Sequence, residues 1–123
     1  MKKRFALTIF LISFLFVGSS IKAASATLFL SPPSGTYTVD GNFAVAVKIN
    51  SGGDSINASE GTIIFNPAEL QVVSLTKSGS IFSLWTTDPT FSNSVGNIVF
   101  GGGTPGNFTG NSGAILTVNF KAK

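Results

Sequence analysis

Residues 59–75 read SEGTIIFNPAELQVVSL, in which two apolar runs are joined by a short corner, Asn66-Pro67-Ala68-Glu69. Asn66 is a residue type that caps the start of a helical turn, and Pro67 suits the first position of that turn. Glu69 stands three residues after the cap, where a capping box places its carboxylate. The stretch therefore predicts two core strands that are joined by a single rigid turn.

The strand predicted after this corner has an irregular alternation. Leu70 and Val72 share one parity, whereas Val73 and Leu75 share the other. Side chains of a strand alternate between its two faces, so one regular strand cannot bury all four on the same face. Either a β-bulge or burial on both faces would account for the pattern.

Period-two alternation also dominates the rest of the chain after residue 26. It is clearest at residues 43–49 and 116–120, where apolar side chains alternate with small or polar ones. Shorter β-like runs occur at residues 27–31, 36–39, 63–65, 81–87 and 98–100. Turn-forming residues separate them, and we expect the glycine-rich stretch Gly101–Gly113 to be a loop inside the domain. The pattern predicts one all-β domain, an antiparallel β-sandwich or barrel.

The first 26 residues have the features of a secretory signal peptide. Lys2-Lys3-Arg4 precede an apolar stretch from Phe5 to Val17, and Ala24-Ser25-Ala26 offers the small residues that a signal peptidase reads. A membrane span needs about 20 apolar residues, more than this stretch supplies. We therefore expect cleavage after Ala26 and a secreted, extracellular or cell-surface domain of residues 27–123. No membrane span is expected in that mature chain.

Removal of this leader changes the charge of the protein. The full chain has a formal net charge of +3, but four of its basic residues lie in the leader. Residues 27–123 keep four lysines against five acidic residues, hence a net charge of −1. Nucleic acids bind to proteins largely through basic patches that neutralise phosphates. The sequence therefore predicts no nucleic-acid partner.

The sequence contains no histidine and no cysteine, which excludes catalytic triads and zinc sites built on these residues. Glycoside hydrolysis needs two carboxylates about 5–10 Å apart, and the spacing of the five acidic residues suggests no such pair. No calcium loop of the D-x-D-x-D-G type is present. We expect a protein that is not an enzyme and has no metal site or cofactor of its own.

Trp85, the single tryptophan, has two interpretations. On an exposed sandwich face it would stack against a sugar ring, which is the basis of an alternative function as a carbohydrate-binding or adhesin module. At the margin of the interior it would be a half-buried aromatic side chain that closes the core. The sequence leaves both interpretations open.

Several stretches resemble the cohesin family: INASEGTIIFNPAELQVVSL (residues 56–75), SGSIFSLW (78–85), GNIVFGGGTPG (96–106) and GAILTVNFKAK (113–123). The motifs are a Glu-Gly-Thr strand, the Asn-Pro-x-x-Leu corner and a late strand that begins with a glycine and ends in Phe-Lys, and the resemblance covers about residues 27–121. The resemblance implies a secreted β-sandwich of jelly-roll topology. It also implies a protein–protein interaction module that binds dockerin-bearing partners in cellulosomes or other cell-surface assemblies.

The resemblance further implies where the partner binds. The contact face in cohesins uses the strand before the Asn-Pro corner and the strands after Trp85, and Glu60 falls where cohesins often place an acidic contact residue. The implied partner-binding residues are Glu60, Thr62, Ile64, Asn93, Asn97 and Val99. An ordinary solvent-facing strand residue is the alternative interpretation at each position. Any calcium would belong to the dockerin, because dockerins carry EF-hand-like loops.

The chain departs from the family pattern in its strand number. Cohesins have nine strands, whereas the sequence predicts about seven before Lys123. The two strands expected after that point are missing, and one of them normally borders the strand that holds Glu60. We therefore expect a C-terminally truncated domain. A third interpretation of the chain is a purely structural piece of a surface layer.

Overall fold

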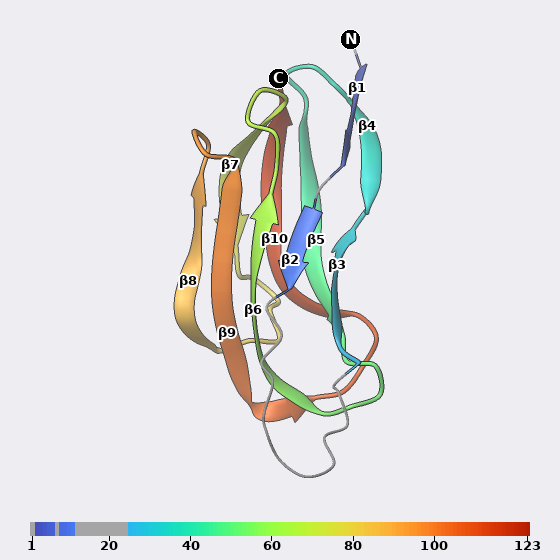
Figure 1. Cartoon of the computed structure of the whole chain (residues 1–123), viewed down its shortest axis with the longest axis vertical. Helices are drawn as coiled ribbons and strands as arrows, with labels where there is room; N and C mark the ends of the chain where they lie inside the picture. Colours follow the sequence, from blue (N-terminus) through green and yellow to red (C-terminus); the bar gives the residue numbers. More distant parts are fainter. Residues whose placement is uncertain (1, 7, 12–24) are drawn as a thin grey trace.

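The computed structural model describes residues 2–6, 8–11 and 25–123 (Figure 1). Its strands are β1 (Lys2–Ala6), β2 (Thr8–Leu11), β3 (Thr27–Ser31), β4 (Ser34–Thr38), β5 (Asn42–Asn50), β6 (Ile56–Ile64), β7 (Leu70–Thr76), β8 (Leu84–Ser92), β9 (Asn97–Phe108) and β10 (Gly113–Ala122). The described residues include no α-helix. Among them, consequently, no helix is long and apolar enough to cross a membrane.

Two four-stranded sheets make up the body of the molecule. One has the strand order β3-β5-β10-β7 and the other β2-β6-β9-β8, and every pairing is antiparallel. β1 pairs separately with β4, also antiparallel. The all-β prediction is confirmed, and the two sheets enclose one apolar core in the manner of a β-sandwich (Figure 1).

Both sheets contribute to this core through alternate residues. Val45 and Val47 come from β5, Phe120 from β10, Ile63 from β6 and Ile98 from β9, and none is more than 1% exposed. Burial of each such side chain contributes about 1.5–3 kcal/mol. The alternation predicted for residues 43–49 and 116–120 is therefore confirmed, because their large apolar members face the interior.

The corner after β6 forms the single capped turn that the sequence predicts, but among the described residues the Glu69 carboxylate makes no capping-box bond to the Asn66 N–H. Asn66 Oδ1 accepts a hydrogen bond of 2.9 Å from the main-chain N–H of Ala68. The Asn66 carbonyl oxygen accepts two more, each 3.0 Å long, from the N–H groups of Glu69 and Leu70. One capped turn thus carries the chain from β6 in one sheet to β7 in the other.

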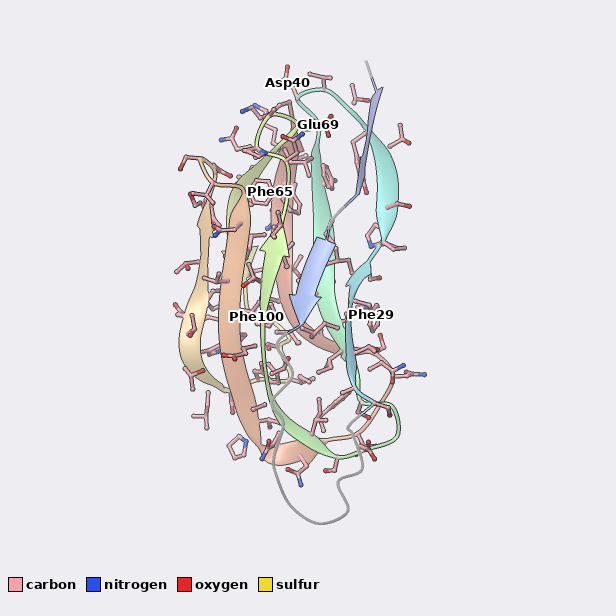
Figure 2. All side chains as sticks on the ribbon, viewed as in Figure 1. Phe29, Asp40, Phe65, Glu69 and Phe100 are labelled. Atoms are coloured by element: carbon pink, nitrogen blue, oxygen red, sulfur yellow. The ribbon has the colours of Figure 1, made fainter. Side chains whose placement is uncertain are left out.

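Two other segments are bonded to this corner. The N–H of Phe65 donates to the carbonyl of Gly96 at 2.9 Å, which ties the corner to the β8–β9 turn. The main-chain N–H of Lys123 donates to the main-chain carbonyl of Glu69 at 2.9 Å, and Lys123 Nζ donates to the Pro67 carbonyl at 3.0 Å. Figure 2 shows Glu69 at the end of the sandwich near the C terminus marked in Figure 1.

The irregular strand after the corner contains a β-bulge. In the β10–β7 pairing, Asn119 lies opposite Ser74 and Phe120 opposite Val72, so that Val73 has no partner. Val73 is 52% exposed while Leu70 and Val72 are buried. Of the two explanations left open by the sequence, the bulge is therefore the right one.

Two strand predictions are wrong. Gly101–Gly113 is not a single loop, because β9 continues through it to Phe108 and pairs with β6 and β8 on its two sides. The predicted strand at residues 81–87 begins only at Leu84. Before it, the N–H of Ile81 donates to the Ala114 carbonyl and the N–H of Ser83 to the Gly103 carbonyl, and these isolated bonds do not form a ladder. In both places the strand boundaries depend on pairing with distant segments, which local composition does not show.

Most of the predicted signal peptide, namely residues 1, 7 and 12–24, lies outside the described residues. Within the described part, β1 lies beside β4, and β2 lies beside β6 with Thr8 opposite Ile64 and Leu11 opposite Gly61. These strands report backbone pairing in the uncleaved chain. Cleavage after Ala26 and export stay predictions.

Replacement of Gly96 by alanine should destabilise the domain. Gly96 has φ = 83°, and an added Cβ would collide with the carbonyl oxygen of Phe65 and with Cδ of Pro67. We expect Gly96→Ala to lower the free energy of unfolding by more than about 1 kcal/mol, measured by chemical denaturation. Gly79→Ala is the matched control, because Gly79 has φ = 75° with no atom within 4 Å of the added Cβ. Equal losses in the two variants would contradict the collision.

Candidate partner-binding face

The pairing of β6 with β9 brings most of the predicted contact residues together. Thr62 lies opposite Val99 and Ile64 opposite Asn97, while Glu60 lies opposite Gly101. Ile63 and Ile98, which alternate with these residues, are buried in the core. Because neighbouring residues of a strand point to opposite faces, Glu60, Thr62, Ile64, Asn97 and Val99 share the side of the sheet that faces away from the core. We call this side of β6, β9 and β8 the outer face.

The outer face has a strip without side chains along β9. Gly101 stands between Glu60 of β6 and Thr86 of β8, and an added Cβ would lie 3.4 Å from Glu60 Cβ and 3.1 Å from Thr86 Oγ1. Gly102 faces inward, where its Cβ would meet Phe82 and Trp85 at 3.0 Å. The glycine run that suggested a loop is thus required by close packing on both faces of a central strand.

β8 adds residues to the outer face that the sequence did not identify. Leu84 lies opposite Gly103, Thr87 opposite Gly101 and Thr90 opposite Val99. Leu84 is 59% exposed. The β8–β9 register shifts twice between Leu84 and Thr90. Regular alternation is therefore broken, and no period-two signal could have shown which residues face outward.

Glu60 is the charged member of the predicted contact set. Among the described residues the ion pairs are Lys77 with Asp88, at 2.6 Å, and Lys121 with Asp40, at 4.0 Å. Glu60 belongs to neither pair, and its side chain is only half-buried. Its carboxylate is therefore available to a cationic group of a partner.

Asn93 does not lie with the other predicted contact residues. It follows the end of β8, and its side-chain amide bridges to β7 in the opposite sheet. Oδ1 accepts from the N–H of Val72 at 2.8 Å, and Nδ2 donates to the Val72 carbonyl at 3.0 Å. The bulge at Val73 interrupts the ladder beside this residue. Asn93 thus holds the two sheets together at one side of the sandwich.

Trp85 lies at the margin of the core. Its ring packs edge-on against Phe82, with 5.8 Å between ring centroids and an interplanar angle of 69°, and it contacts the buried cluster. Lys77 Nζ is 5.4 Å from the ring centroid, within the range of a cation–π contact. Since Trp85 pairs with the inward-facing Gly102, this placement favours the interpretation of Trp85 as an aromatic that closes the core.

A shallow surface hollow lies on the other sheet, over β5, β7 and β10. It is lined by Asn42, Phe43, Ala44, Val73, Ser74, Asn119 and Phe120, and Asn119 Nδ2 donates to Ser74 Oγ across it at 2.9 Å. None of the predicted contact residues belongs to it. In the described part of the chain, no group of three or more acidic, histidine or cysteine side chains is placed to hold a metal ion.

Comparisons of the chain with protein-family models, with curated proteins and with solved structures found no match. The contact residues that the resemblance implies lie, apart from Asn93, on the neighbouring strands β6 and β9.

Loss of the Asn93 bridge should reduce stability. Asn93→Ala removes both bonds to Val72 and leaves two part-buried main-chain groups without their partner, at a cost of about 1–3 kcal/mol, measured by chemical denaturation. Asn93→Asp keeps the acceptor but places a carboxylate oxygen against the Val72 carbonyl, so it should not restore wild-type stability. Asn119→Ala, which loses only the exposed bond to Ser74, is the control. An Asn93→Ala variant as stable as Asn119→Ala would show that the bridge contributes nothing.

Truncation of Trp85 should also affect stability. Trp85→Ala removes a half-buried ring and its contacts with Phe82 and Lys77, and we expect a loss of about 2 kcal/mol, below the ~3–5 kcal/mol typical of fully buried aromatic residues. Leu84→Ala, at the exposed neighbouring position, should change stability by less than about 0.5 kcal/mol. Thermal denaturation of both variants measures the difference. An unchanged melting temperature in Trp85→Ala would contradict the interpretation of the ring as part of the core.

Proposed function

We propose that the chain is a secreted, non-catalytic protein-binding module of cohesin type, with jelly-roll topology. In this function, the outer face of β6, β9 and β8 binds a dockerin-bearing partner in an extracellular or cell-surface assembly. The module brings the partner to a site and performs no chemistry on it.

The observation that carries the proposal is the convergence of Glu60, Thr62, Ile64, Asn97 and Val99 on one face. These residues come from two separate sequence segments, and the register of β6 with β9 places them side by side. The Glu60 carboxylate, which has no ion pair among the described residues, lies among half-exposed apolar and polar side chains. A core of apolar contacts with a few directional polar groups is the usual composition of a specific protein interface.

The path of the chain gives further support. The strand before the Asn-Pro corner is β6, and the strands after Trp85 are the rest of β8 and β9. All three belong to one sheet, which is where the sequence resemblance puts the contact face. The rigid corner then takes the chain to β7 in the other sheet, as a sandwich that presents a preformed surface requires.

In this proposal, calcium belongs to the partner and not to this chain. Dockerins carry EF-hand-like loops, which bind calcium through oxygen ligands. A calcium requirement would then act on the fold of the partner, and removal of calcium would release the complex without unfolding this chain.

Reversal of the charge at Glu60 tests the proposal. The protein is immobilised and exposed, in calcium, to the secreted and surface proteins of its source organism, and the captured proteins are identified by mass spectrometry. We expect capture of a dockerin-bearing protein that a chelator releases. Glu60→Lys should weaken binding of that purified partner at least tenfold, the effect of losing about 1.4 kcal/mol at an interface centre.

Glu69→Lys is the matched control, because it makes the same charge change at the corner, away from the outer face (Figure 2). It should bind as the wild type does. Equal weakening by the two substitutions would indicate a general electrostatic effect and contradict the assignment of the outer face. Capture of polysaccharide, or capture of nothing, would contradict the dockerin partner.

A further inference from the structure

The two lateral sides of the sandwich are closed in different ways. On the side of β7 and β8, side chains link the sheets: Asn93 bonds to the main chain of Val72, and Lys77 pairs with Asp88 at 2.6 Å. β8 also contains Pro89 and two register shifts. Proline, charges and bulges are the devices that stop an edge strand from pairing with another chain. This side is therefore protected.

The side of β6 has none of these devices at Gly61–Ile64. This segment contains no proline and no charged residue, and its pairing with β9 runs without a register shift from Ala58 to Ile64. A regular edge of this kind exposes a row of main-chain N–H and C=O groups that can template a further strand. β6 is consequently the edge of the sandwich that needs a cover.

The structure shows a strand in that position. β2 lies antiparallel to β6, with Thr8 opposite Ile64 and Leu11 opposite Gly61, and in Figure 1 it lies between β6 and β3. The interior begins directly at this edge, because Ile63 is 1% exposed and Gly61 is buried. A Cβ on Gly61 would lie 3.0 Å from the Phe100 ring and 3.2 Å from Leu28. A strand seated here completes both the ladder and the wall of the core.

We propose that the β6 edge at Gly61–Ile64 is an acceptor site for an extended strand of a different protein. In the uncleaved chain Thr8–Leu11 occupies the site, and the predicted removal of residues 1–26 vacates it. The partner strand takes the same antiparallel register over four residues. It carries apolar side chains at the positions opposite Gly61 and Ile63, where the edge borders the core, and it contains no proline.

The physical basis is strand addition, in which main-chain hydrogen bonds supply affinity and alternate side chains supply selectivity. While it remains attached, the chain's own segment has the advantage of a tether, which corresponds to an effective concentration of the order of millimolar. A partner strand therefore binds only after that segment has left the edge. This inference concerns the edge of the sheet and does not rest on the proposed function of the outer face.

The absence of cysteine from the sequence allows a direct test by disulfide trapping in the full chain. The acceptor is the chain with Thr62→Cys, in which Ile9→Pro prevents the internal strand from pairing. The probe is a synthetic peptide of residues 2–13 with Phe10→Cys, because residue 10 pairs with Thr62. Mixed disulfides formed in a glutathione buffer are quantified by mass spectrometry.

We expect the peptide to cross-link to the Thr62→Cys acceptor at least tenfold faster than to a Thr90→Cys acceptor on the protected edge strand β8. A peptide with Ile9→Cys in place of Phe10→Cys should cross-link poorly, since it places the sulfur on the opposite face. Without Ile9→Pro, cross-linking to the thiol at position 62 should also be slow. Equal rates at positions 62 and 90, or an excess of protein dimers linked through position 62, would overturn the proposal.

A second measurement covers the case in which Ile9→Pro does not fold. The double variant Phe10→Cys/Thr62→Cys should form an internal disulfide, because residues directly opposite in a ladder have Cβ atoms about 4.5–5.5 Å apart. The variant Ile9→Cys/Thr62→Cys should form it much more slowly. Equal rates in the two variants would show that no strand occupies this register and would likewise overturn the proposal.

Discussion

The capped turn at Asn66 is the constraint on which the arrangement of the strands depends. Its side-chain and main-chain oxygens together accept three hydrogen bonds within four residues, so the exit direction of the chain from β6 is fixed. That direction sends β7 to the opposite sheet. The β8–β9 turn and the last residue, Lys123, both bond to the same corner. Segments from three parts of the sequence therefore share one anchor, without a disulfide.

The outer face owes its shape to residues that have no side chain. Gly101 and Gly102 let β6, β8 and the Trp85 ring approach the central strand β9 closely, and neither has room for a larger residue without movement of its neighbours. Glu60 and the threonines of β8 then stand on either side of a bare strip of backbone. Gly102 allows close packing in the core, and its neighbour Gly101 allows close packing on the outer face. The same glycine run therefore shapes both the core and the outer face.

The sandwich also separates its two sides by chemistry. Specific side-chain bonds close the side of β7 and β8, where the Asn93 amide bonds the main chain of Val72 on the edge strand β7. Backbone pairing with a strand closes the side of β6. The β7–β8 side is closed by side chains of the domain itself and so stays closed. The β6 side is closed only while a strand is paired with β6. The two sides are thus suited to different purposes, one structural and one open to exchange.

The sequence by itself determined the strand class of the fold, the capped corner and the inward residues of β5 and β10, because these follow from local dihedral preferences and from period-two alternation. The sequence resemblance also selected Glu60, Thr62, Ile64, Asn97 and Val99 as contact residues. Only the tertiary structure decided that β9 continues through its glycines, that Asn93 bridges the sheets, that Trp85 closes the core and that Leu84 faces outward. Each of these depends on register or contact between residues distant in sequence, and alternation within one segment carries no information about such pairing.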